Sequence, residues 1–175
     1  MVGRASNLPE RLQELHKLKI IDFGLSTKWC DENGKHLSRA QMNSFKGNLI
    51  FGSKNAFRGQ RLSRRDDLIS LAYLLVYIVD GDLEFMKGQC EDGEDNASSN
   101  SDEFIKIGKG KLNMTPEDIC PSAESRELVP FIQEVYSLGF SEEPNYSKLN
   151  FLLVKILMNA NVVPDNQYEW NKIIK

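Results

Sequence analysis

Asp22 is the residue whose position most directly suggests chemistry. It follows Lys19–Ile21, a short apolar run, and is followed by Phe23 and Gly24. Two adjacent β-branched residues favour a strand, and a glycine lets the backbone turn sharply after it. A carboxylate where a strand ends can bind a hard cation such as Mg²⁺. The same tripeptide also fits an ordinary solvated turn, so its context has to decide.

A buried helix is the strongest structural signal in the chain. Ser63 and Asp66 have the spacing of a capping box, which predicts a helix start. The residues from Leu68 to Val79 are apolar on nearly every face, and Gly81 supplies a stop signal. We therefore expect a central helix at about 63–80 that is buried on all sides.

The other segments are predicted from their composition. The chain from 25 to 62 has no clear period and several glycines, which predicts a long ordered loop. An acidic and small-residue stretch at about 86–103 predicts a solvated insertion. Helices are expected between about 115 and 160, the first capped by Thr115, with a possible kink at Pro130.

Composition excludes several classes of protein. The 175 residues carry 22 Lys and Arg against 25 Asp and Glu, a net charge of −3, so we expect one domain and no nucleic-acid partner. Three dispersed cysteines and two histidines match no structural metal site and favour a reducing compartment. No apolar run is long enough to span a membrane, and no secretory signal is visible. We expect a cytoplasmic or nuclear protein without membrane partners.

Three stretches in sequence order resemble the casein kinase I family of protein kinases. They run from Ile20 to Ser26, from Gly47 to Asn55 and from Ser63 to Tyr73. The family has Asp-Phe-Gly in the first, Ser-x-Asn at the end of the second, and an SRRDDLxSL run opening the central helix. Pro144–Leu149 and Tyr168–Asn171 also resemble the family's last helix and its terminal aromatic motif, so the resemblance covers about residues 17 to 171.

The resemblance implies a fold and a domain organisation. We expect a mainly α protein, a truncated protein-kinase C-lobe built around the central helix, with a short strand before Asp22. Residues 1–16 would be a lead-in and 17–175 the partial C-lobe. Residues 22–55 would be the activation segment.

The resemblance also implies functional residues. Ile21, Asp22, Phe23 and Gly24 would bind ATP and Mg²⁺, with Asp22 as the metal ligand. A substrate loop would include Lys46, Gly47, Asn48 and Ile50; here Asn48 replaces the family's threonine and Ile50 its arginine. Arg65 and Asp67 would be structural, although Asp67 also fits a simple helix N-terminal acid.

Other parts of a kinase are missing from the sequence. It contains no glycine-rich G-x-G-x-x-G loop, no V-A-I-K strand and no H-R-D-x-x-x-x-N catalytic loop. We therefore expect casein kinase I-type transfer from ATP to serine or threonine by resemblance, with no catalytic residues and no catalysis in this chain alone. The alternative is a non-catalytic pseudokinase-derived protein-binding module, or a gene fragment. Its partner would bind the surface that a kinase N-lobe covers.

Overall fold

The computed structural model describes residues 18–87 and 100–163, and within them the protein is mainly helical, as predicted. The lead-in at 1–16, residues 88–99 of the predicted insertion and the aromatic motif at 168–171 lie outside the described residues. The chain divides into two compact units, 1–26 with 157–175, and 27–156. Each unit is described by itself.

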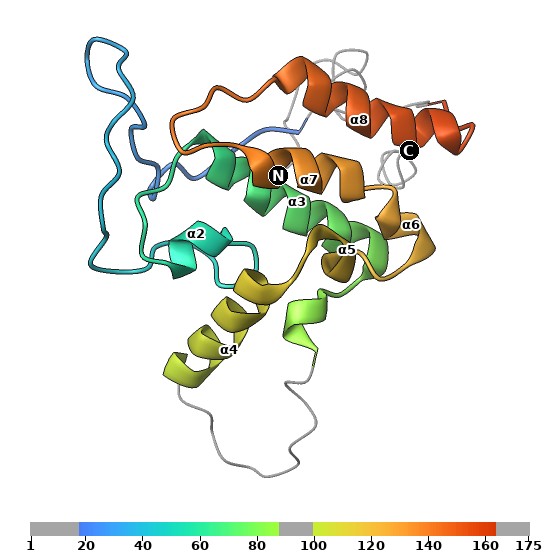
Figure 1. The fold of residues 1–175 in the computed structure, drawn as a ribbon, viewed down its shortest axis with the longest axis horizontal. Coiled ribbons are helices and arrows are strands. Elements are labelled where there is room, and N and C mark those ends of the chain that lie inside the picture. The colour runs from blue at the N-terminus through green and yellow to red at the C-terminus, as the bar shows by residue number, and fades with distance from the viewer. Residues whose placement is uncertain (1–17, 88–99, 164–175) are drawn as a thin grey trace, which may run out of the picture. The chain divides into compact units, whose positions relative to one another are not determined.

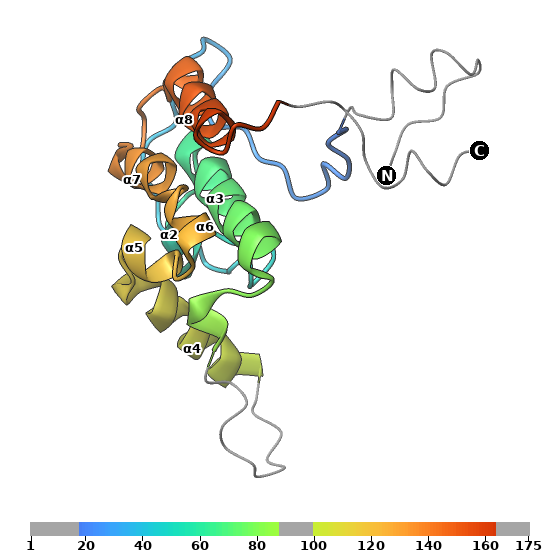
Figure 2. The same ribbon diagram turned by 90° about the vertical axis from the view of Figure 1, so that its right-hand side faces the viewer.

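The unit of residues 27–156 is an assembly of helices. α3 (Arg64–Asp80) packs along α7 (Val129–Ser137), and also contacts α2 (Lys54–Phe57) and α6 (Ala123–Arg126). α4 (Asn100–Asn113) packs against α2 and against the 3₁₀ helix η1 (Glu84–Met86), as Figures 1 and 2 show. The remaining helices are α5 (Pro116–Ile119) and α8 (Tyr146–Asn159), whose last residues enter the other unit.

The central helix begins and ends where the sequence predicts. A carboxylate oxygen of Asp66 accepts a hydrogen bond from the Ser63 backbone N–H at 2.7 Å, which satisfies a donor that the first turn leaves free. Gly81 has φ of 77° and donates its N–H to the Tyr77 carbonyl. Glycine adopts this left-handed conformation without steric cost, so α3 ends there.

α3 is not buried on all sides, and this part of the prediction is wrong. Ile69, Tyr73 and Val76 are in the core of the unit. The opposite side carries four large apolar residues whose exposed fractions lie between 37% and 68%: Leu71, Leu74, Tyr77 and Ile78. Within residues 27–156, the ring of Phe51 contacts Tyr77 on this face, with 5.7 Å between the ring centroids.

Three other local predictions need correction. Lys19–Ile21 form no strand, because no partner strand pairs with them in the described part of the chain. The loop predicted at 25–62 includes α2, and the last four residues of the predicted insertion, 100–103, form the start of α4. Pro130 lies in the first turn of α7, where its missing N–H costs nothing, and so it starts that helix rather than kinking it.

Two glycines bring α4 close to its neighbours. A Cβ on Gly108 would lie 2.8 Å from a ring carbon of Phe57 in α2, and one on Gly110 would lie 2.7 Å from the Cβ of Phe85 in η1. Any larger side chain would force these elements apart. The close approach places Lys111 of α4 next to the segment that precedes α2, whereas Lys109 is exposed.

Candidate functional site

The predicted substrate-loop residues Lys46, Gly47, Asn48 and Ile50 lie in a loop at 46–52, called the substrate loop below, which closes on itself through Asn48. Lys46 and Gly47 are exposed at its start. The Asn48 side-chain oxygen accepts hydrogen bonds from the backbone N–H groups of Ile50 and Phe51 at 2.7 and 3.0 Å. The Asn48 backbone carbonyl accepts from Gly52 N at 2.7 Å. A side chain that bonds backbone two residues ahead is typical of tight turns, so Asn48 determines the local shape of this loop.

The loop's carbonyl groups converge on one lysine from α4. The Lys111 ammonium donates to the carbonyl oxygens of Leu49, Ile50 and Gly52, each at 2.7 Å. Lysine has three N–H donors, and these contacts use all of them. Lys111 itself has no exposed surface.

Aromatic rings surround the same ammonium. Its nitrogen lies 4.7 to 4.9 Å from the ring centroids of Phe57, Tyr73 and Phe85. Faces of aromatic rings attract cations at this range, most strongly when water is excluded. Burial lowers the pKa of Lys111 to about 7, whereas the carbonyl oxygens and the rings favour its charged form.

Asp66 anchors residues 53–55, at the end of the predicted activation segment. One oxygen of this carboxylate accepts from Ser53 Oγ at 2.7 Å and from Asn55 Nδ2 at 2.9 Å. The other oxygen caps α3 through Ser63 N. Asp66 is 2% exposed, and hydrogen bonds to a buried carboxylate are stronger than those between neutral groups. The Ser-x-Asn sequence is therefore fastened to the first turn of the central helix.

The two predicted structural residues beside Asp66 differ in their surroundings. Arg65 donates to the Leu138 carbonyl at 3.1 Å and lies 3.9 Å from the Asp66 carboxylate. Asp67 is exposed, and partial burial followed by the negative charge of Asp66 raises its pKa. No hydrogen-bond or ion-pair partner of the Asp67 side chain is seen within residues 18–87 and 100–163, so its predicted role stays a prediction.

The other predicted site is in the unit of residues 1–26 and 157–175. Asp22 has φ of 62°, the left-handed region that aspartate tolerates better than most residues. Its side chain accepts from Gly24 N at 3.2 Å, and Ser26 N donates to the Phe23 carbonyl. All residues from 18 to 26 are exposed. These contacts make a local turn with one outward carboxylate.

The described residues do not form a metal site by themselves. No cluster of three or more His, Cys, Asp or Glu side chains exists in the described part of the chain. Mg²⁺ prefers six oxygen ligands, which one carboxylate cannot provide without phosphates and water. Asp22 and Gly24 thus fit part of a nucleotide–magnesium site and no complete one.

Curated casein kinase I homologues align with most of the chain. A probable casein kinase I homolog of Encephalitozoon cuniculi is 35% identical over 151 residues, 85% of this chain. Casein kinase 1-like protein HD16 of Oryza sativa subsp. japonica is also 35% identical over 151 residues. Casein kinase I homolog 2 of Saccharomyces cerevisiae is 27% identical over 161 residues, 91% of this chain. This is a casein kinase I-like chain.

The casein kinase I-like chain corresponds to less than half of each of these relatives. It spans 45% of the Encephalitozoon protein, 19% of the rice protein and 28% of the yeast protein. No protein-family model matches it. No helix in the described residues is long and apolar enough to cross a membrane.

Sequence reasoning missed Lys111, although the casein kinase I-like chain carries a signal for it. Gly108 and Gly110 are unusual inside a helix, where glycine costs stability relative to alanine. Glycine at such positions indicates a close approach to another element, here to Phe57 and Phe85, whose rings surround Lys111. Asp66 was predicted only as a cap, because its bonds to Ser53 and Asn55 depend on tertiary structure.

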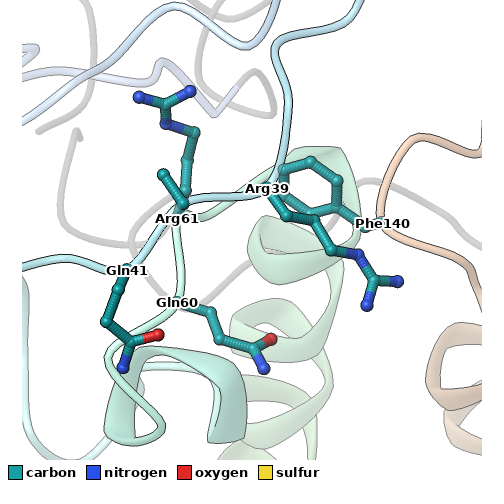
Figure 3. Close-up of a pocket in the computed structure, with 6 residues that line it drawn as sticks. Arg39, Gln41, Gln60, Arg61 and Phe140 are labelled. Carbon is teal, nitrogen blue, oxygen red and sulfur yellow. The ribbon is translucent and has the colours of Figure 1, made fainter.

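A separate hollow of the casein kinase I-like chain has a polar wall. It has a volume of about 290 Å³ and is lined by Arg39, Ala40, Gln41, Gln60, Arg61 and Phe140. Figure 3 shows the Arg39 guanidinium beside Phe140 and the Arg61 side chain extending in another direction. Arg61 donates to the Ser38 carbonyl at 3.0 Å. None of the predicted site residues lines this hollow.

Proposed function

We propose that the chain supplies the protein-substrate side of a casein kinase I-type serine/threonine protein kinase, which transfers a phosphoryl group from ATP to a hydroxyl group. The observation that carries this proposal is the hydrogen-bonded substrate loop. Its carbonyls bind Lys111, and the segment after it binds Asp66. Phosphoryl transfer depends mostly on positioning, so a preformed loop is what a protein substrate requires.

The ATP side is incomplete in these 175 residues. When bound with its phosphates, Mg²⁺ would neutralise charge on the transferred group, and Asp22 is the residue that would contact it. The sequence has no glycine-rich loop, no V-A-I-K lysine and no H-R-D catalytic loop. We propose that residues 1–175 alone do not transfer phosphate.

A direct assay tests this lack of activity. The purified chain, incubated with Mg²⁺, radiolabelled ATP and casein, is expected to label casein no more than the Asp22→Asn variant does. Transfer that the wild-type chain performs and Asp22→Asn abolishes would contradict the proposal, because it would show a working metal site in this chain.

Complementation tests the kinase assignment itself. The part of the Encephalitozoon homologue that lies outside the aligned region is produced separately and mixed with this chain. We expect ATP-dependent phosphorylation of casein that is lost with Asp22→Asn. Formation of a stable complex without any transfer would instead favour the second candidate function.

That second candidate is a non-catalytic protein-binding module. It is favoured by the apolar face of α3, formed by Leu71, Leu74, Tyr77 and Ile78. Apolar patches on a soluble surface usually mark an interaction site. Leu74→Glu combined with Ile78→Glu should abolish binding of the complementing polypeptide while the variant still unfolds cooperatively. Unchanged binding would exclude this face as the interface.

A further inference from the structure

Burying the charged side chain of Lys111 is energetically unfavourable unless polar groups compensate it. It is completely buried, and no carboxylate of the described residues pairs with it. The elements packed around it, α2, η1 and α3, contribute the rings of Phe57, Phe85 and Tyr73. A buried charge costs free energy unless it is paired or hydrogen-bonded. A leucine or methionine could fill such an aromatic surrounding, so packing alone does not account for a lysine.

What the lysine adds is three directed hydrogen bonds to a loop far away in sequence. Its acceptors are the carbonyls of Leu49, Ile50 and Gly52. The amides of Ile50, Phe51 and Gly52 are already bonded to Asn48. Lys111 and Asn48 together therefore satisfy most of the polar main-chain groups between 49 and 52.

The loop also has little freedom to take another shape. A Cβ on Gly52 would lie 2.6 Å from the Asn48 carbonyl oxygen, so the turn is closed tightly. Turning any of the three bound carbonyls away would leave a buried ammonium donor without an acceptor. The conformation of the loop and the burial of the lysine thus depend on each other.

We propose that Lys111 is a positioning residue for the protein substrate: its ammonium, held in the aromatic surrounding of α2, α3 and η1, fixes the main chain of the substrate loop at residues 49–52. The word substrate rests on the proposed function. The ordering of the loop by Lys111 does not, because it can be measured on the chain without any kinase activity.

Hydrogen exchange of single amides tests the proposal. In Lys111→Met, the amides of Ile50, Phe51 and Gly52 are expected to exchange at least tenfold faster than in the wild-type chain, whereas amides of α7 keep their rates. Lys109→Met is the matched control, because Lys109 lies two residues away on the same helix and is exposed. It should change neither region. Unchanged loop rates in Lys111→Met, or equal acceleration in α7, would overturn the proposal.

A measurement on the wild-type chain decides the case if Lys111→Met does not fold. Nuclear magnetic resonance of the side-chain ammonium groups should show Lys111 protons in slow exchange with water and close to the ring protons of Phe57 and Tyr73. Lys109 supplies the reference for a solvated lysine. Exchange of the Lys111 ammonium as fast as that of Lys109 would overturn the proposal.

The complemented kinase gives a readout that separates positioning from stability. Lys111→Met should raise KM for a peptide substrate at least fivefold and leave KM for ATP unchanged. Equal effects on both, or none on the peptide KM, would contradict a role in substrate positioning. If complementation yields no activity at all, the proposed function fails while the exchange result still decides whether Lys111 orders the loop.

Discussion

The substrate loop and the Asp22 turn are both short, glycine-containing segments, but the loop is held by residues distant in sequence and the turn by near neighbours. Carbonyls of the loop bind Lys111, 59 to 62 residues away in sequence, and the segment after it binds Asp66. The Asp22 turn has the contact between Asp22 and Gly24 and the bond between Ser26 and Phe23, both between near neighbours. Phe23 is 67% exposed, whereas Lys111 has no exposed surface.

The difference shows which of the two predicted sites the described residues can hold in a fixed shape. Contacts with distant residues of a packed core can fix a loop, because moving the loop would leave buried polar groups without hydrogen-bond partners. Local bonds in water contribute little net free energy, because water replaces them at similar strength. The predicted substrate loop is therefore ordered by contacts within residues 27–156, whereas the predicted magnesium ligand Asp22 lies in an exposed turn whose hydrogen bonds, among the described residues, are local.

The largest effect should come from Asp66, compared with its neighbour Asp67. Asp66→Ala leaves the donors of Ser53, Asn55 and Ser63 without an acceptor in a buried site. We expect a loss of about 3 kcal/mol or more in the free energy of unfolding, measured by urea denaturation. Asp67→Ala removes an exposed carboxylate and should change it by less than about 0.5 kcal/mol. Similar losses of unfolding free energy in the two variants would contradict the view that Asp66 anchors this segment and Asp67 is only a surface acid.

Glycine substitutions compare the Asp22 turn with α4, the helix that carries Lys111. Gly110→Ala places a methyl group 2.7 Å from the Phe85 Cβ and should destabilise the chain by about 1–3 kcal/mol, because α4 must shift. At Gly24 the nearest atom is the movable Asp22 side-chain oxygen at 3.2 Å. Gly24→Ala should change the free energy of unfolding by less than about 0.5 kcal/mol. A Gly24 effect as large as that at Gly110 would show that the Asp22 turn is packed.

The smallest expected effect is a pH dependence at Lys54, next to the loop. Burial, then the charges of Arg58 and Arg65, lower the pKa of Lys54 to about 8. The unfolded chain therefore binds more protons between pH 8 and 10.5, and stability contributed by this group rises with pH over that range. Between pH 7.5 and 9.5 the wild-type chain should gain stability relative to Lys54→Met, measured by urea denaturation. Lys111 contributes equally to both proteins, and a parallel pH dependence would contradict the shifted pKa.

Local signals in the sequence predicted the parts of the fold that depend on neighbours in the chain. The capping box of Ser63 and Asp66, the stop at Gly81 and the cap at Thr115 all form, because each needs only residues within one or two turns. Periodicity also predicted that the protein is mainly helical. The prediction that α3 is buried on every side was wrong. An apolar sequence shows which faces of a helix can be buried, but not whether neighbouring elements cover those faces.

The resemblance predicts which residues belong to the candidate site, but not the contacts that hold them in place. The resemblance predicts Lys46, Gly47, Asn48 and Ile50 as substrate-loop residues, which stays a prediction; the structure shows Asn48 and Ile50 in the hydrogen bonding of one loop. Lys111 could not be found this way, since nothing local tells which distant carbonyls a lysine will meet. The strand before Asp22 failed for a related reason: apolar residues favour a strand, but only a partner strand completes it.

The most direct test of the account compares the two regions in one sample of the wild-type chain. Amide hydrogen exchange, corrected for intrinsic rates, is measured for Ile50, Phe51 and Gly52 and for Gly24 and Ser26. We expect the three loop amides to exchange at least about 100-fold more slowly than the two in the Asp22 turn, since opening the loop must break contacts with the core. Equal protection in both regions would contradict the account that contacts with the core order the loop at 49–52 while local bonds hold the Asp22 turn, and with it our proposal for the protein-substrate side.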